Sequence, residues 1–245
     1  NKLIPEKLLK LQEKLLTLRK SGAIYLQNGD TGYASAPSNI ALIKYWGKKK
    51  SAYQVPENSS VSLTLGSFRS FTKVEVIGRF FPMGETPEFI PPHRFTLVQN
   101  SESLSENSST EAESQHRIRN FQTGSEKIEQ FLKDILFPYA CDIGLNVESM
   151  NNFPTACGIA SSASGFAALC AAVADLLQLE KHFTEEELQY WLYTWARLGS
   201  GSATRSALTG ENLFVAWELQ KDELCTTKSL PYNSAWQKIR HCVLV

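Results

Sequence analysis

Apolar residues recur with helical spacing near the start of the chain. Residues 5–20 place leucines at positions 8, 11, 15 and 18 and charged residues between them, which puts the leucines on one face of a helix. Ser21 and Gly22 end the pattern. The leucine face needs an apolar partner, either the rest of this chain or a second copy, and packing on the same chain is favoured.

Three further segments are predicted to be helical. Apolar spacing indicates a helix over residues 125–137, and residues 167–177 are an unbroken run of helix formers. Thr184 precedes Glu187 by three positions, which is the capping box at the start of a helix that runs to about residue 197.

Alternating apolar and β-branched residues predict the strands. Residues 61–65 and 67–77 are expected to form a hairpin or meander, and Asn28-Gly29-Asp30 has hairpin-turn chemistry. The other predicted strands are residues 40–44, 141–150, 214–217 and 239–245. Residues 80–92 are rich in proline and read as a loop, and the polar residues 99–114 as a mobile surface loop.

Composition narrows the class of protein. A chain of 245 residues suggests one large or two small domains. Lys+Arg and Asp+Glu are both 25, so net charge gives no reason to expect a nucleic-acid or membrane partner. No apolar run approaches the roughly 20 residues of a spanning helix. Five cysteines without a C-x-x-C pattern favour reduced thiols and a cytoplasmic protein, and the four histidines lack metal-ligand spacing.

A loop of small residues opens the helix near position 161. Gly158 and the serines at 161, 162 and 164 precede the helix formers, and unsatisfied N–H groups at such a helix start can bind phosphate. The alternative is a buried, alanine-rich helix with a serine N-cap and no ligand. The loop is neither a Walker A motif nor Gly-x-Gly-x-x-Gly.

Two cationic residues are candidates for anion binding. Lys44 lies among Ile, Tyr and Trp residues, so it either snorkels along Trp46 or holds its charge near a substrate oxygen. Arg205 ends a second small-residue loop, residues 199–206. Its planar guanidinium suits a carboxylate or phosphate, and the alternative is a surface arginine at a helix start.

Three stretches together resemble the diphosphomevalonate decarboxylases of the GHMP kinase superfamily. They are NIALIKYWGKKK (39–50), NNFPTACGIASSASGFAAL (151–169) and ARLGSGSATRS (196–206), with PENSSVSLTL (56–65) after the first. The first and third are specific to the decarboxylase branch, whereas the second is shared more widely among GHMP kinases. The resemblance covers most of residues 33–217.

The resemblance implies an α+β GHMP kinase fold with a ribosomal protein S5 domain 2-like N-terminal domain. It implies ATP-dependent decarboxylation of (R)-5-diphosphomevalonate to isopentenyl diphosphate, in the mevalonate pathway of isoprenoid biosynthesis, with Mg²⁺. The 3-hydroxyl would be phosphorylated to become a leaving group. The partners would be these small molecules, without nucleic acid or membrane, and the enzyme could be a homodimer.

The resemblance also implies residue roles. Lys44, Asn39 and Arg205 would be catalytic, with Arg205 also binding the substrate carboxylate. The other implied substrate-binding residues are Tyr45, Lys48, Ser200 and Ser202. The implied ATP-binding residues are Gly158, Ala160, Ser161, Ser162 and Ser164, and Ser162 would lie closest to the metal.

One part of the family pattern is missing. The catalytic aspartate of the family belongs to a C-terminal segment that should follow Val245. The sequence is then either a fragment with an incomplete C-terminal domain, which we expect, or a naturally shortened protein that has lost its base. The expected division is a helical extension at 1–22, an N-terminal domain at 23–217 and the start of a C-terminal domain at 218–245. The alternatives are a related mevalonate or phosphomevalonate kinase or decarboxylase, and a non-catalytic nucleotide-binding protein.

Overall fold

The computed structural model describes most of the chain. The described residues are 5–47, 54–77, 93–98, 118–119, 125–137, 143–154, 159–208, 213–219, 225–231, 234–235 and 239. The predicted loops at 80–92 and 99–114, the start of the phosphate loop and the predicted last strand therefore fall wholly or largely outside the described residues. Ile239 is the single described residue of that last strand.

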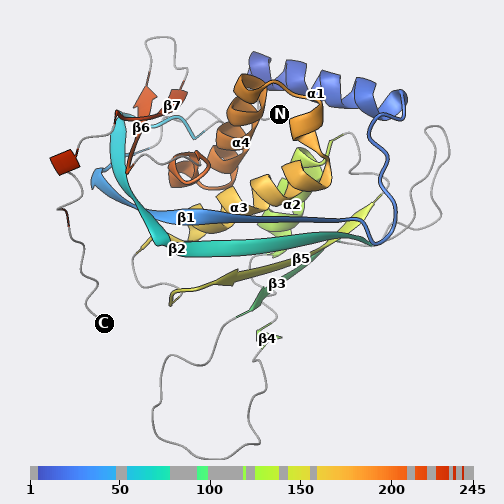
Figure 1. Ribbon diagram of the computed structural model, residues 1–245, viewed down its shortest axis with the longest axis horizontal. Helices are drawn as coiled ribbons and strands as arrows, with labels where there is room; N and C mark the ends of the chain where they lie inside the picture. Colours follow the sequence, from blue (N-terminus) through green and yellow to red (C-terminus); the bar gives the residue numbers. More distant parts are fainter. Residues whose placement is uncertain are drawn as a thin grey trace, which may run out of the picture.

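A mixed sheet forms one layer of the fold, and the helices cover one of its faces (Figure 1). The strands are β1 (Thr31–Ile43), β2 (Ser60–Ile77), β3 (Arg94–Val98), β4 (Ile118–Arg119), β5 (Gly144–Asn151), β6 (Phe214–Leu219) and β7 (Cys225–Ser229). Their order is β4-β3-β5-β2-β6-β7, and β1 pairs with β2. All of these pairs are antiparallel except β3 with β5.

Strand β2 organises the sheet. Its first residues pair with β6, its second half pairs with β5, and β1 runs antiparallel along most of its length. The predicted hairpin within residues 61–77 is wrong, because Gly66 continues the strand instead of turning it. The Asn28-Gly29 turn does form, with Asp30 N–H donating to Gln27 O, but it leads into β1 and joins no earlier strand.

The helical predictions are confirmed. The helices are α1 (Glu6–Lys20), α2 (Ser125–Ile135), α3 (Ser161–Leu176) and α4 (Glu185–Gly199), with short 3₁₀ turns η2 (Leu179–Lys181) and η3 (Gly201–Arg205). Helix α4 begins with the predicted capping box, in which Thr184 and Glu187 satisfy each other's backbone N–H groups. This removes two of the unpaired donors at the helix start.

The main core lies between the sheet and the helices. Inward residues of β1, β2 and β5, such as Ala36, Val74 and Val147, pack against the alanine-rich face of α3. Leu8, Leu11 and Leu15 of α1 are buried in the same core, beside α4, and Leu18 packs against it, so the leucine face packs on its own chain as predicted. The division of the chain at residues 22 and 217 stays a prediction.

One glycine sets how closely the sheet approaches α3. A Cβ on Gly32 of β1 would lie 2.2 Å from the carbonyl oxygen of Ala172 and 2.6 Å from the backbone nitrogen of Leu176. Next to it, the N–H of Tyr33 donates to the carboxylate of Asp175 at 2.8 Å. The start of β1 therefore crosses the last turns of α3 in direct backbone contact.

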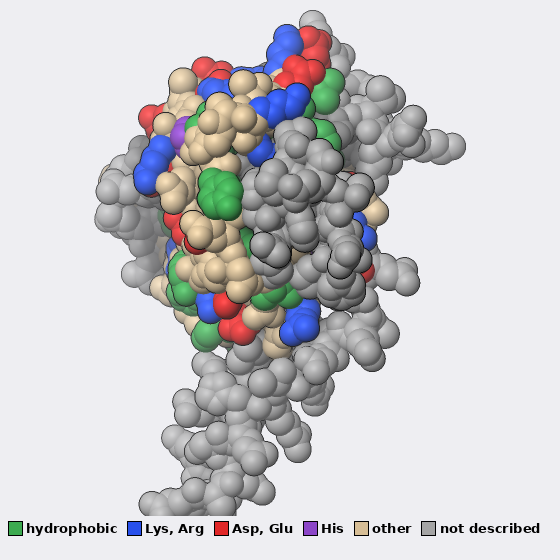
Figure 2. Space-filling model, turned by 90° about the vertical axis from the view of Figure 1, so that its right-hand side faces the viewer, with side chains coloured by type: hydrophobic (Ala, Val, Ile, Leu, Met, Phe, Trp, Pro, Cys, Tyr) green, Lys and Arg blue, Asp and Glu red, His purple; other side chains and the backbone are tan. Residues whose placement is uncertain are grey.

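The surface carries mixed charge. In Figure 2 acidic and basic side chains lie next to each other over the coloured residues at the top of the view. Lys7–Glu186 and Lys14–Glu187 are two such ion pairs between α1 and α4. No helix within the described segments is both long and apolar enough to cross a bilayer.

Candidate functional site

The candidate site lies where the end of β1, the start of β2, η3 and β6 meet. Five buried or half-buried side chains gather here, and we call this cluster the Arg205 pocket: Asn39, Tyr45, Ser60, Arg205 and Trp217. Asn39 and Ser60 come from paired strands, Arg205 ends η3, and Trp217 is the register partner of Ser60 on β6. Two regions of the chain that are distant in the sequence, residues 39–60 and 205–217, thus supply one cluster.

Arg205 is the central charge of this pocket. Its side chain is almost fully buried, at 2% exposure, and its Nη1 donates to the hydroxyl of Ser60 at 2.6 Å. The guanidinium lies 5.9 Å from the Trp217 ring centroid. Burial lowers the pKa of Arg205 to about 10, because desolvation penalises the charged form.

Arg205 has no acidic partner among the described residues, and its buried Nε has no hydrogen-bond acceptor there. The hydroxyls of Ser62 and Thr64 on β2 are likewise buried without a partner in the described structure. Buried cations in proteins are normally paired. A preorganised guanidinium without an acid is the arrangement expected of a receptor for an anionic ligand group.

Asn39 is fixed beside Arg205 by the same loop. It is buried at 2% exposure, and its Nδ2 donates to the hydroxyl of Ser206 at 2.7 Å and to the carbonyl oxygen of Ser202 at 3.4 Å. Its neighbour Ser38 donates to the carbonyl oxygen of Ile159, just before α3. The end of β1 therefore connects the Arg205 pocket to the start of α3.

Tyr45 forms the outer wall of the pocket. Its ring meets Trp217 edge to face, with centroids 5.2 Å apart, and a Cβ on Gly201 would lie 3.0 Å from its phenolic oxygen. Lys44 follows the last residue of β1 and is exposed, so the predicted strand ends one residue before it. Its carbonyl oxygen, rather than its ammonium group, makes the contact with Asn58.

The start of α3 forms the second part of the site. Ala160, the residue before the helix, has a left-handed backbone (φ 53°), and no side chain caps the helix. The serine N-cap of the alternative hypothesis is thus not present. The first turn contains no acidic residue, so its N–H groups and the positive end of the helix dipole are free of a competing carboxylate.

The three predicted serines of this loop differ in position. Ser162 is exposed and Ser161 half-buried, so both hydroxyls can be reached from outside. Ser164 is fully buried, and its hydroxyl bonds to Ser70 Oγ at 2.6 Å and to Ser161 O at 3.2 Å. Gly158 and Lys48 lie outside the described residues.

A cavity of about 230 Å³ adjoins the start of α3. Its walls are mainly apolar, with Phe95 and Leu97 from β3 and Phe166 from α3, and Asn151 and Ser161 are among its polar groups. We call it the α3 cavity. A site of this kind suits a flat, largely apolar group with a few hydrogen-bonding atoms.

The two parts of the site are in contact. Gly199, at the end of α4, lies so close to Phe166 of α3 that a Cβ there would be 2.1 Å from the ring. Lys127 of α2 donates to the carbonyl oxygen of Gly199 at 3.0 Å and lies over the Phe166 ring. Ser200 follows directly, so the Arg205 loop begins at the wall of the α3 cavity.

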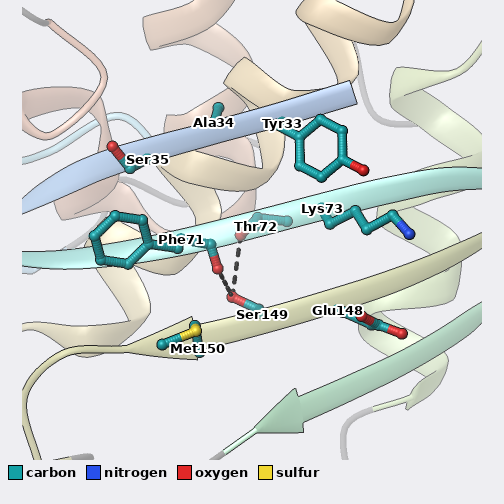
Figure 3. Close-up of a pocket in the computed structure, with 9 residues that line it drawn as sticks. All are labelled: Tyr33, Ala34, Ser35, Phe71, Thr72, Lys73, Glu148, Ser149 and Met150. Carbon is teal, nitrogen blue, oxygen red and sulfur yellow. Dashed lines mark hydrogen bonds between the residues drawn. The ribbon is translucent and has the colours of Figure 1, made fainter. Parts of the chain in front are cut away.

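Another groove of the structure lies away from this site. It has a volume of about 440 Å³ and crosses β1, β2 and β5. Figure 3 shows Tyr33, Phe71, Lys73, Glu148 and Met150 along it. They alternate with residues that face the helices, so this groove is the open face of the sheet. It includes none of the predicted site residues.

Comparison with known proteins agrees with the geometry. The family model of the diphosphomevalonate decarboxylase-like N-terminal domain matches residues 36–86 and 91–230. The chain belongs to this family. It is 38% identical over 221 residues to the diphosphomevalonate decarboxylase of Saccharomyces cerevisiae, covering 88% of this chain and 49% of that protein. The chain spans about half the length of the curated relatives it matches.

Solved structures of the decarboxylase family share this fold. The mevalonate diphosphate decarboxylase of Staphylococcus aureus superposes with a TM-score of 0.57 at 33% identity, over 84% of this chain and 51% of that one. A complex of MDDEF with MVAPP, AMPPCP and magnesium gives a TM-score of 0.57 at 33% identity, over 82% and 50%. The predicted α+β GHMP kinase fold is therefore confirmed.

Sequence reasoning missed several residues of the site. Ser60, Trp217, Asn58 and Lys127 were not singled out, although Ser60 and Asn58 lie within the quoted stretch PENSSVSLTL. The one available signal was polar residues at alternate, inward positions of a strand, Ser60 and Ser62. No group of three or more His, Cys, Asp or Glu side chains assembles as a metal site within the described part of the chain.

Proposed function

We propose that this chain is the ATP- and substrate-binding part of an enzyme that decarboxylates (R)-5-diphosphomevalonate to isopentenyl diphosphate. The products would include ADP, phosphate and carbon dioxide. The single observation that carries the proposal is Arg205, a buried guanidinium with no acidic partner among the described residues. The family membership supports the identity of the missing anion, a substrate carboxylate.

The Arg205 pocket would bind the reacting end of the substrate. Arg205 would hold the carboxylate in two-point contact, and Ser200 and Ser202 would position it from the same loop. Asn39 and Lys44 would lie near the 3-hydroxyl, where a cation favours the ionised oxygen. Tyr45 and Lys48 would face the diphosphate.

The start of α3 would bind the ATP phosphates. Its uncapped first turn, free of acidic residues, fits an anion, and the α3 cavity would take the adenine base. The exposed hydroxyl of Ser162 would be one ligand of Mg²⁺ among phosphate oxygens, and the ion would neutralise developing charge. The related complex that contains AMPPCP and magnesium supports this assignment.

The arrangement explains how the two ends work together. A tertiary hydroxyl leaves poorly, and phosphorylation makes it a good leaving group. Departure of the resulting phosphate builds positive charge at C3. Loss of carbon dioxide then supplies the electron pair that removes this charge and forms the alkene. The close packing of Gly199 on Phe166 supports this proposal, because it would keep the phosphate loop and the substrate loop near each other for the phosphoryl transfer.

The test is a coupled assay on the full-length protein that contains this chain. ADP and carbon dioxide would be measured with mevalonate, mevalonate 5-phosphate and mevalonate 5-diphosphate as separate substrates. Release of both products in equal amounts with the diphosphate alone supports the proposal. ADP without carbon dioxide would indicate a kinase, turnover with the monophosphate a related decarboxylase, and nucleotide binding without turnover a non-catalytic protein.

A further inference from the structure

Asn58 binds the backbone on both sides of Tyr45. Its Oδ1 accepts the N–H of Trp46 at 2.8 Å, and its Nδ2 donates to the carbonyl oxygen of Lys44 at 3.1 Å. The same Nδ2 also donates to the carbonyl oxygen of Ser59 at 2.7 Å. The half-buried side-chain amide of Asn58 therefore holds the backbone directly before and directly after one residue of the candidate site, Tyr45. We call these two hydrogen bonds a bracket.

Within the described part of the chain, the backbone of residues 44–46 has no pairing with a neighbouring strand. The last register pair of β1 with β2 is Ile43 with Val61, so the backbone after Ile43 has left the sheet. Burial holds only the Tyr45 ring, because Ile43 before it is 56% and Trp46 after it 75% exposed. The backbone hydrogen bonds that the strand would have supplied are replaced here by the Asn58 side chain.

The bracket sets where two predicted substrate contacts lie. Fixing the peptide groups before and after Tyr45 fixes the direction of its side chain, which packs on Trp217 and against Gly201. Trp217 in turn covers Arg205. A Tyr45 that moved away would open the outer wall of the Arg205 pocket and carry Lys44 with it.

We propose that Asn58 is a positioning residue for the substrate end of the site, acting through Lys44 and Tyr45. This inference rests on the proposed function, since it takes the ligand of the Arg205 pocket to be diphosphomevalonate. None of the hydrogen bonds of Asn58 is to Arg205. Its effect should therefore fall on binding of the diphosphate substrate and leave the nucleotide end unchanged.

The chain offers a matched control with the same bonding pattern. Asn152 accepts the N–H of Arg69 at 2.7 Å and donates to the carbonyl oxygen of Ser67 at 2.8 Å, so it brackets Phe68 as Asn58 brackets Tyr45. Asn152 contacts no residue of the Arg205 pocket among its described hydrogen bonds. Loss of either bracket should lower stability to a similar extent.

The experiment compares Asn58→Ala and Asn152→Ala in the full-length protein. Calorimetric titration would give the Kd of mevalonate 5-diphosphate and, separately, of a non-hydrolysable ATP analogue. We expect Asn58→Ala to weaken the diphosphate about tenfold, the loss of one or two net hydrogen bonds, with the nucleotide Kd within twofold. Asn152→Ala should keep the wild-type Kd for the diphosphate despite a similar fall in Tm.

Two results would overturn the proposal. One is an Asn58→Ala protein that loses stability but binds mevalonate 5-diphosphate as tightly as the wild type. The other is equal weakening in both variants. If the wild type does not bind mevalonate 5-diphosphate, the proposed function fails, and hydrogen exchange of the Trp46 amide then tests the role of Asn58 by itself. Protection of this amide in the wild type but not in Asn58→Ala supports the role of Asn58 in holding the backbone. An unprotected amide in the wild type refutes it.

Discussion

Replacing Arg205 with methionine tests whether its buried charge is kept for binding at the expense of stability. Methionine fills a similar volume without charge. In the wild type Arg205 is 2% exposed, and its guanidinium has one hydrogen bond among the described residues, to Ser60. We therefore expect Arg205→Met to bind no substrate carboxylate and yet to fold at least as stably as the wild type.

The size of the expected change in unfolding free energy follows from the pKa of Arg205. Burial lowers the pKa of Arg205 from 12.5 to about 10, and at 1.36 kcal/mol per pKa unit this corresponds to about 3 kcal/mol against the charged form. The variant loses the bond to Ser60 and the contact with Trp217, together about 2 kcal/mol. The net expectation is about 1 kcal/mol of added stability, or about 2–4 °C in Tm.

The assay is urea unfolding followed by fluorescence, alongside substrate titration. Arg69→Met is the matched control, because Arg69 is half-buried and donates to both the hydroxyl and the carbonyl oxygen of Ser35 at 3.0 and 3.1 Å. That variant should be destabilised by about 1–2 kcal/mol. An Arg205→Met protein less stable than the wild type by more than about 1 kcal/mol would refute the reasoning, since it would show that the charge stabilises the fold.

Two further predictions concern the fold. Gly32→Ala should destabilise the protein by about 3 kcal/mol or more in urea unfolding, because its Cβ would lie 2.2 Å from the backbone of α3. Gly66→Ala is the control: the space around its Cβ is open, so the stability should change by less than about 1 kcal/mol. His93 accepts the N–H of Leu145 at 3.0 Å, and burial lowers its pKa to about 4. As the pH falls, the imidazole of His93 is protonated near pH 6.5 in the unfolded chain but only near pH 4 in the folded state. The free energy of unfolding should therefore fall by up to about 3 kcal/mol between pH 6.5 and 4. His93→Gln should lose that part of the pH dependence, and identical profiles in both proteins would contradict the assignment.

Elements that depend on residues close together in the sequence were predicted correctly. The capping box of Thr184 and Glu187 depends on residues three positions apart, and it forms as expected. The continuity of β2 does not depend on local signals, because Gly66 lies at a register shift and β1 pairs with β2 on both sides of it, at Leu65 and at Arg69. The contact of Gly32 with α3 joins residues far apart in the sequence, so no spacing rule could reveal it.

The same limit applies to the site. The small-residue loop and the position of Arg205 were visible in the sequence, and they indicated an anion. The burial of Arg205 beneath Trp217 was not visible, because it is produced by pairing of β6 with β2. Asn58 was missed because its role depends on a side chain that bonds to a backbone fourteen positions away.

The pairing of β2 with β6 also sets when the anion pocket can exist during synthesis. Ser60 and Arg205, which share the hydrogen bond at its centre, are 145 positions apart in the chain. A ribosome adding about 5–20 residues per second needs roughly 7–30 s to reach Arg205 after Ser60 has been made. Throughout that interval the inward serines of β2 lack both Arg205 and strand β6, which cover them in the folded protein. The Arg205 pocket can therefore form only after this later part of the chain has been made.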